Sequence, residues 1–86
     1  KKYEEALKEF ESSLITDDVL IQSKVLYNQG NTLYRMGKLP ESIMAYKKAL
    51  ELNPDDEDAK YNLEFVRQQL KDQAQKQQQD PQQQDE

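Results

Sequence analysis

The chain has 86 residues, of which 12 are Lys or Arg and 17 are Asp or Glu, so its net charge is −5. This negative charge disfavours binding to nucleic acids or anionic membranes, because both carry negative charge themselves. The absence of Cys and His excludes disulfides, thiolate nucleophiles, imidazole bases and the usual zinc sites, and we expect no cofactor. No apolar run approaches the ~20 residues that span a bilayer, so we expect no direct membrane insertion by this sequence.

Helical spacing of apolar residues recurs four times along the chain, and strand-type alternation is absent. Helix-breaking residues separate the four stripes at Asp17-Asp18, at Gly37-Lys38 and at residues 53–56. The pattern predicts an all-α protein of four helices. In chain order, the stripes are Tyr3, Leu7, Phe10 and Leu14; Leu26, Gly30, Leu33 and Met36; Ile43, Tyr46 and Leu50; and Ala59, Leu63, Val66 and Leu70.

The C-terminal part of the chain is rich in Gln and holds no large apolar residue after Leu70. A segment with nothing to bury cannot offset its ordering entropy, so we expect residues 72–86 to be a disordered low-complexity tail or a fraying helix. Because Gln is a fair helix former, the preceding helix can continue to about Gln79. We expect it to end at Asp80-Pro81, because the residue before a proline disfavours the helical conformation. A solvated linker is favoured over a contact segment as the role of this tail.

An internal repeat relates the predicted helices in alternation. Residues 2–7 align with residues 38–43, 36 positions later, and residues 25–28 align with residues 59–62, 34 positions later. The first and third helices are therefore of one type, and the second and fourth are of another. This alternation predicts an array of helix pairs.

Two runs in the middle of the chain carry a specific pattern: Tyr-Asn-Gln-Gly-Asn at residues 27–31 and Ala-Leu-Glu-Leu-Asn-Pro at residues 49–54. With them, residues 23–56 resemble one unit of the tetratricopeptide repeat family, whose period is about 34 residues. Three positions depart from the family pattern, namely Leu26 for Trp, Gln29 for Leu and Ser42 for Ala, and we expect looser helix contacts there. The family positions that match are Gly30, Leu33, Gly37, Tyr46, Ala49 and Pro54.

The resemblance implies an antiparallel helix-turn-helix array, which is a piece of an α-solenoid. Residues 1–18 would be the second helix of a truncated repeat and residues 19–56 a complete repeat. Residues 57–71 would be the first helix of a further repeat or a capping helix, followed by the tail at 72–86.

The residue types give this pattern a physical reason. Gly30 has no side chain, so two antiparallel helices can approach closely there, with Ser42 and Ala49 facing it from the partner helix. Pro54 ends the helix before it, and Asp55 or Asp56 caps the next one. The acids at 55–58 lack the glycine and the terminal glutamate of a calcium loop, so we favour capping over a metal site.

The resemblance implies a non-catalytic protein-interaction module that binds a peptide or a partner helix in a concave groove. Aromatic rings there supply contact area, and asparagine amides can bond to the backbone of an extended peptide. The alternative is that these side chains pack within the array. The family's groove positions fall on Lys24, Tyr27, Asn28, Asn31, Tyr34 and Arg35, and on Asp58, Tyr61, Asn62, Phe65, Gln68 and Gln69.

Three other roles compete with peptide binding in the groove: a carboxylate clamp, catalysis and a structural role. Asn31 and Asn62 match positions with which a subclass of the family grips a C-terminal carboxylate, but Tyr27 stands where that clamp has lysine, which disfavours the clamp. Catalysis is disfavoured because the clustered acids have no paired base or nucleophile. The main rival is a structural role, in which the apolar stripe of the first helix is exposed and forms a homodimer.

A narrower resemblance concerns residues 57–64 and the Gln-rich tail. They are similar to the repeat region of bacterial aerotolerance-type proteins, which join a membrane-anchored von Willebrand factor A domain to tetratricopeptide repeats. This resemblance implies a membrane-associated complex at the periplasmic face of a bacterial membrane. Without it, we expect a cytoplasmic location.

Overall fold

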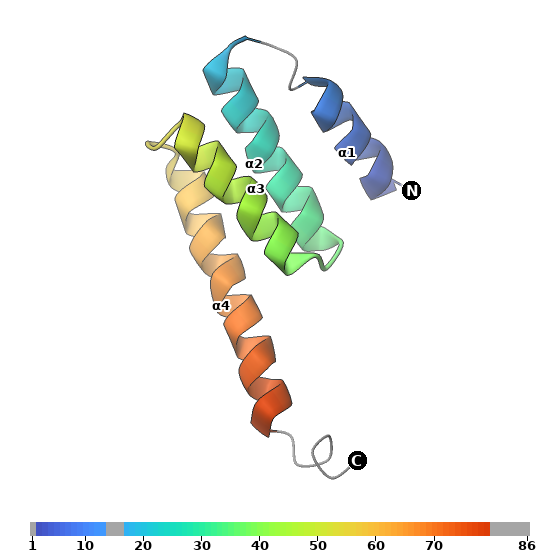
Figure 1. The fold of residues 1–86 in the computed structure, drawn as a ribbon, viewed down its shortest axis with the longest axis vertical. Helices are drawn as coiled ribbons and strands as arrows, with labels where there is room; N and C mark the ends of the chain where they lie inside the picture. The colour runs from blue at the N-terminus through green and yellow to red at the C-terminus, as the bar shows by residue number, and fades with distance from the viewer. Residues whose placement is uncertain (1, 14–16, 80–86) are drawn as a thin grey trace.

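The computed structural model of the chain describes residues 2–13 and 17–79, which form four α-helices. They are α1 (Lys2–Ser13), α2 (Val19–Arg35), α3 (Leu39–Leu52) and α4 (Glu57–Gln79). Consecutive helices pack on one another, with α2 between α1 and α3 and with the first half of α4 beside α3 (Figure 1). The described ranges contain no strand. The predicted all-α helical-repeat fold is therefore confirmed.

Side-chain carboxylates fix where α2 and α4 begin. Asp18 Oδ1 accepts hydrogen bonds from the backbone N–H groups of Leu20 at 3.0 Å and Ile21 at 3.3 Å. Asp56 Oδ1 accepts one from the N–H of Ala59 at 3.1 Å. Each carboxylate satisfies amide donors at the positive end of its helix. The predicted capping is confirmed, and it falls to Asp56.

The turn between α2 and α3 depends on Gly37, whose φ is +81°. This left-handed conformation costs glycine little because glycine has no Cβ. It lets the N–H groups of Gly37 and Lys38 donate to the carbonyls of Tyr34 and Leu33, each at 2.9 Å. Both bonds are those of the Schellman motif, which closes a helix and reverses the chain. The reversal places α3 antiparallel to α2.

The closest approach of α2 and α3 occurs at Gly30. A Cβ added there would lie 2.6 Å from Cδ1 and Cε1 of the Tyr46 ring, so the ring rests directly on the backbone of α2. Tyr46 is 2% exposed and is one of the largest fully buried side chains. The close approach predicted for Gly30 is confirmed.

Two buried hydroxyls join the same pair of helices. Ser23 Oγ, on α2, donates to the carbonyl of Ala49 at 2.9 Å, and Ser42 Oγ, on α3, donates to the carbonyl of Gly30 at 2.8 Å. The expectation of a looser contact at Ser42 is wrong, because the small hydroxyl fits fully buried and finds an acceptor. Leu26 and Gln29 line a cleft of about 170 Å³ against α3, and looser packing at these two positions stays a prediction.

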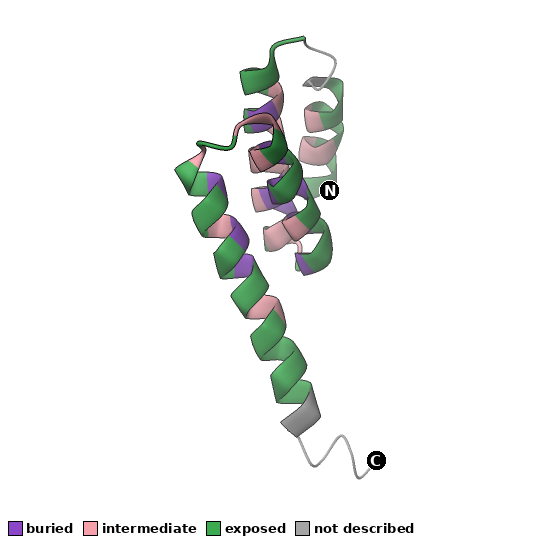
Figure 2. Ribbon diagram, turned by 60° about the vertical axis from the view of Figure 1, so that its left-hand side comes forward, coloured by how far each residue is buried: buried purple, intermediate pink, exposed green. Residues whose placement is uncertain are grey.

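The buried core lies where α2, α3 and the first half of α4 face one another (Figure 2). The central cluster of this core comprises Leu39, Tyr46, Leu63 and Val66. Fully buried Ala49 and Ala59 keep the neighbouring helix surfaces close.

The second half of α4 extends beyond the core and is exposed at residues 71–77 (Figure 2). Of the two alternatives expected for the tail, a disordered segment or a fraying helix, residues 72–79 take the helix, and the continuation of the helix to Gln79 is confirmed. Gln is compatible with a helix, and Gln68 Nε2 donates to Asp72 Oδ1 one turn later at 3.0 Å. The expected end at Asp80-Pro81 lies outside the described residues.

Helix α1 packs along α2 and leaves only part of its apolar stripe open. Tyr3 is exposed, whereas Leu7 and Phe10 are half-buried. Leu14, the last member of the stripe, lies outside the described residues. The expectation of an exposed apolar face on this helix is therefore met at Tyr3 and only in part at Leu7 and Phe10, because contact with α2 covers these two in part.

The contact at Gly30 makes a testable prediction for stability. Overpacking a core typically costs about 1–3 kcal/mol, and the better helix propensity of alanine returns up to about 1 kcal/mol. We therefore expect Gly30→Ala to lower the free energy of unfolding by about 1–2 kcal/mol. Urea denaturation followed by circular dichroism measures this change. A gain in stability, as at a helical glycine without a neighbour, would contradict the contact.

Candidate functional site

Helices α2 and α4 line a cleft of about 350 Å³, which we call the groove. Buried Tyr46 of α3 and Val66 of α4 form its floor. Side chains of α2 supply one wall, and side chains of α4 supply the other. The complete lining is Tyr27, Asn31, Tyr34, Arg35, Tyr46, Tyr61, Asn62, Phe65 and Val66.

A hydrogen-bond network on the groove floor connects the three helices. Asn31 Oδ1 accepts from the hydroxyl of Tyr46 and from Asn62 Nδ2, the second at 3.0 Å. Asn62 Nδ2 also donates to the hydroxyl of Tyr27 at 3.2 Å. Since the two asparagines lie on different walls, their contact fixes the position of α4 relative to α2.

The network leaves polar atoms available in the groove. Among the described residues, Asn31 Nδ2 and Asn62 Oδ1 have no hydrogen-bond partner. No buried side-chain nitrogen or oxygen of the described part lacks a partner, so both atoms keep some exposure to solvent. The groove therefore offers one amide donor and one carbonyl acceptor, which is what the backbone of an extended peptide can pair with.

Aromatic rings bridge the walls and line the opening of the groove. Tyr34 of α2 and Phe65 of α4 meet edge to face, with ring centroids 5.8 Å apart. Tyr27 lies tilted against Tyr46, with centroids 6.0 Å apart. On α4, Tyr61 is 72% exposed and Phe65 is 42% exposed. These two rings present apolar area to solvent at a concave surface, where a ligand can cover it.

The charges at the groove come from α2. Arg35 is the one charged side chain among the described lining residues. Lys24 lies next to the groove, with Nζ 5.5 Å from the centroid of the Tyr27 ring. Helix α2 contains no acidic residue. This wall is therefore positive, although the chain as a whole carries a charge of −5.

Of the twelve groove positions given in the sequence analysis, seven line the groove: Tyr27, Asn31, Tyr34, Arg35, Tyr61, Asn62 and Phe65. Lys24 lies beside it, and half-buried Asn28 is not part of the lining. Asp58 lines a second cleft at the turn before α4, and Gln68 bonds to Asp72. Gln69 is half-buried outside the groove lining.

Sequence analysis missed Tyr46 and Val66 as lining residues, because their helical spacing assigns them to the core. The structure gives Tyr46 both roles, since its ring is buried and its hydroxyl reaches Asn31. A signal for this was present in the residue type. The hydroxyl of a buried tyrosine usually needs a hydrogen-bond partner, and an asparagine on the facing helix is a suitable one.

The helices and the groove define a class of protein: an all-α helical repeat with a concave surface. Residues 23–56, which cover most of α2, all of α3 and the turn after it, match the family model of the tetratricopeptide repeat. The match supports the tetratricopeptide repeat family for this segment. Repeats of this family mediate protein–protein interactions and are not catalytic. No curated protein and no solved structure matches the chain.

The environment of Tyr46 predicts how stability depends on pH. Burial raises the pKa of Tyr46 above its ordinary value of 10.0, while side-chain hydrogen bonds and, to a smaller extent, the positive charge of Arg35 act in the opposite direction. Because the pKa is higher in the folded chain than in the unfolded one, the stabilising contribution is complete below pH 10.0. It is lost as the pH rises through the folded-state pKa.

We therefore expect the free energy of unfolding to fall as the pH is raised above 10.0, and to fall less steeply in Tyr46→Phe. Denaturation in urea at a series of alkaline pH values measures both slopes. Equal slopes for the two proteins would contradict the assigned burial of the hydroxyl. The substitution is also expected to cost about 1 kcal/mol at neutral pH through the lost hydrogen bond to Asn31.

Proposed function

We propose that the chain is a non-catalytic interaction module and that the groove between α2 and α4 binds an extended segment of a partner protein. The observation that carries this proposal is the combination of exposed aromatic rings with unpartnered amide atoms in one concave surface. Tyr61 and Phe65 supply apolar area that a ligand removes from water. Asn31 and Asn62 supply a donor and an acceptor for its backbone.

A ligand in extended conformation suits this groove better than a partner helix. A helix has already satisfied its backbone groups internally and presents only side chains. An extended peptide has free N–H and C=O groups, which pair with amide side chains. The open atoms Asn31 Nδ2 and Asn62 Oδ1 are on opposite walls and match these needs.

The network also argues against a clamp for a C-terminal carboxylate. Such a clamp needs the asparagine N–H groups of both walls to point at the carboxylate. Here Asn62 Nδ2 is engaged by Tyr27 and Asn31. The only open atom of the Asn62 amide is an oxygen, which repels a carboxylate.

The structural alternative is a homodimer through the apolar stripe of α1. Exposed Tyr3 is the observation in its favour, whereas half-burial of Leu7 and Phe10 reduces the apolar area left for a partner. The groove, which is lined from three helices, is favoured over this face. A homodimer stays a prediction, which light scattering at several protein concentrations tests.

The cellular setting also stays a prediction. The similarity to aerotolerance-type proteins, with its periplasmic location, finds no support in the comparisons. None of the described helices is long and apolar enough to cross a membrane. A protein partner is favoured over a nucleic acid by the net charge of −5.

The proposal predicts that Tyr61→Ala weakens peptide binding without unfolding the chain, because Tyr61 is 72% exposed. Peptides are first selected from a random displayed library on the immobilised full chain and then titrated as synthetic peptides. We expect a loss of about tenfold or more in affinity, as for an aromatic contact at the centre of an interface. Circular dichroism and the urea midpoint should stay unchanged.

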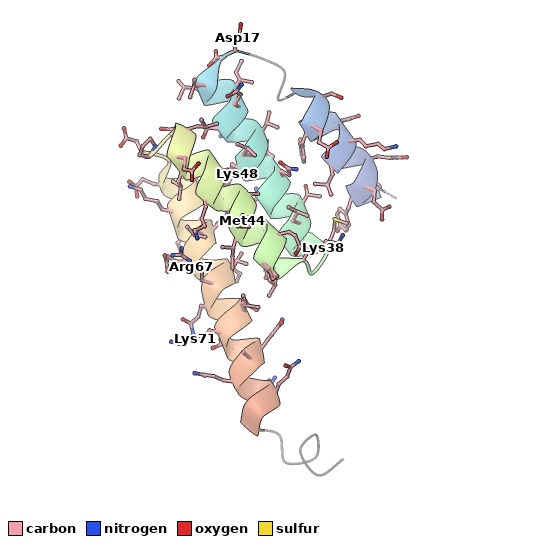
Figure 3. The ribbon with its side chains drawn as sticks, viewed as in Figure 1. Asp17, Lys38, Met44, Lys48, Arg67 and Lys71 are labelled. Carbon is pink, nitrogen blue, oxygen red and sulfur yellow. The ribbon has the colours of Figure 1, made fainter. Side chains whose placement is uncertain are left out.

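Met44→Ala is the matched control, because Met44 is 56% exposed on α3 and lies outside the groove lining (Figure 3). It removes a similar exposed apolar side chain, and binding should be retained. Equal losses in the two variants, or no peptide selected above background, would overturn the groove proposal. Asn62→Ala is a less clean test, since it also removes two hydrogen bonds and should lower stability.

A further inference from the structure

Arg35 is an unusual side chain in the groove. Among the described residues its guanidinium has no carboxylate within ion-pair distance, whereas the other arginine, Arg67, pairs with Glu64 at 2.8 Å. It is exposed, lines the groove and ends helix α2. A cation at the end of a helix interacts favourably with the helix dipole. That effect explains a positive charge at this point of the sequence, but it does not require the side chain to line the groove.

The neighbours of Arg35 define what an occupant would meet there. Tyr34, the preceding residue, contacts Phe65 edge to face across the groove. Exposed Tyr61 lies one turn before Phe65 on α4. The Arg35 end of the groove therefore combines an aromatic surface with a guanidinium group, which can donate hydrogen bonds to two oxygens at once.

A different charge lies beside the N-terminal part of α2, in the second cleft. The turn before α4 holds acidic residues 55–58, and these line a cleft together with Lys24. Lys24 and Arg35 are 11 positions apart on α2, which places them about 16 Å apart along the helix axis. A negatively charged group on a ligand is therefore repelled at the acidic turn and attracted at Arg35.

We propose that the occupant of the groove is an extended peptide with an Asp or Glu side chain paired with Arg35 and a large apolar residue next to it. The apolar residue packs on Tyr34, Tyr61 and Phe65. This inference rests on the proposed function and names the chemistry of its ligand. It is argued from charge complementarity, because Arg35 is the one charged lining residue and has no partner among the described residues.

The recognised carboxylate belongs to a side chain rather than to a chain end. Arg35 lies at one end of the groove. A peptide that runs through the groove and continues past this end places an internal residue beside Arg35. A terminal carboxylate would need the N–H groups of both asparagines, and those of Asn62 are engaged with Asn31 and with the hydroxyl of Tyr27. A peptide with a blocked C-terminus should therefore bind as well as one with a free C-terminus.

A set of synthetic peptides, titrated against the 86-residue chain, tests the inference. The parent peptides are those selected by display, and each is made with acetylated and amidated ends. In a second set every Asp becomes Asn and every Glu becomes Gln, and in a third set the C-terminus is free. Affinities are measured for the wild type, Arg35→Gln and Arg67→Gln. Arg67→Gln makes the same chemical change on α4, outside the groove lining, where the exposed pair with Glu64 contributes little (Figure 3).

We expect the acidic peptides to bind the wild type about tenfold more tightly than their amide counterparts, the size of one charge-assisted hydrogen-bonded contact. Arg35→Gln should abolish this preference, and Arg67→Gln should keep it. Raising the salt concentration should weaken only the acidic peptides.

Three outcomes would overturn the inference. If peptides bind in a Tyr61-dependent way with no preference for acids, the groove stands but the charge recognition does not. If acids are preferred only with a free C-terminus, the recognised group is a terminal carboxylate. If the preference survives Arg35→Gln, another residue recognises the acid. A complete lack of binding in all sets would instead reject the proposed function itself.

Discussion

The ring of Tyr46 rests on the backbone of α2 at Gly30, while its hydroxyl donates to Asn31 one residue further along the same helix. These two contacts fix the rotation and the separation of α3 relative to α2. They also fix the side-chain oxygen Oδ1 of Asn31, which accepts a hydrogen bond from Asn62 Nδ2 on α4. The position of the second groove wall therefore depends on a side chain buried beneath the first, so core packing and the shape of the groove are coupled.

Small residues make this arrangement possible. Gly30, Ser42 and Ala49 leave the space in which the helices meet, and the hydroxyls of Ser23 and Ser42 return hydrogen bonds to the facing backbones. Neither hydroxyl leaves an unpaired polar atom in the core, so burial of these serines costs little. The result is a rigid helix pair with its polar groups satisfied, onto which α4 packs through Leu63 and Val66.

Much of the fold could be predicted from the sequence, because each helix carries an apolar stripe and ends at a residue with a local reason to end it. Gly37 and Asp56 acted as their residue types predict. The length of α4 was harder to predict, since a polar Gln-rich segment packs on nothing and its helicity depends on weak local interactions. The half-burial of Leu7 was missed because the amount of α1 that α2 covers depends on the angle between them, which spacing does not encode.

The sequence was sufficient to predict which helix face carries the candidate site, but not which side chains contact one another there. Helical periodicity placed Tyr27, Asn31 and Arg35 on one side of α2, and the structure brings them together with Tyr61 and Phe65. Periodicity could not show that the amide nitrogen of Asn62 is engaged in hydrogen bonds within the chain, because those bonds depend on distances between helices. Nor could it separate Asn28 from the groove, since Asn28 and Arg35, seven positions apart at about 100° per residue, point in nearly the same direction.

The central claim is that Tyr46 joins α2 to α3 and sets the position of α4 through Asn31 and Asn62. Nuclear Overhauser contacts in a labelled sample of the full chain test this most directly. The account predicts contacts from the Tyr46 ring to the α protons of Gly30, and from the side-chain amide of Asn62 to the ring of Tyr27 and to Asn31. Contacts of the Tyr46 ring limited to its own helix, with an Asn62 amide that shows no contact to α2, would contradict it.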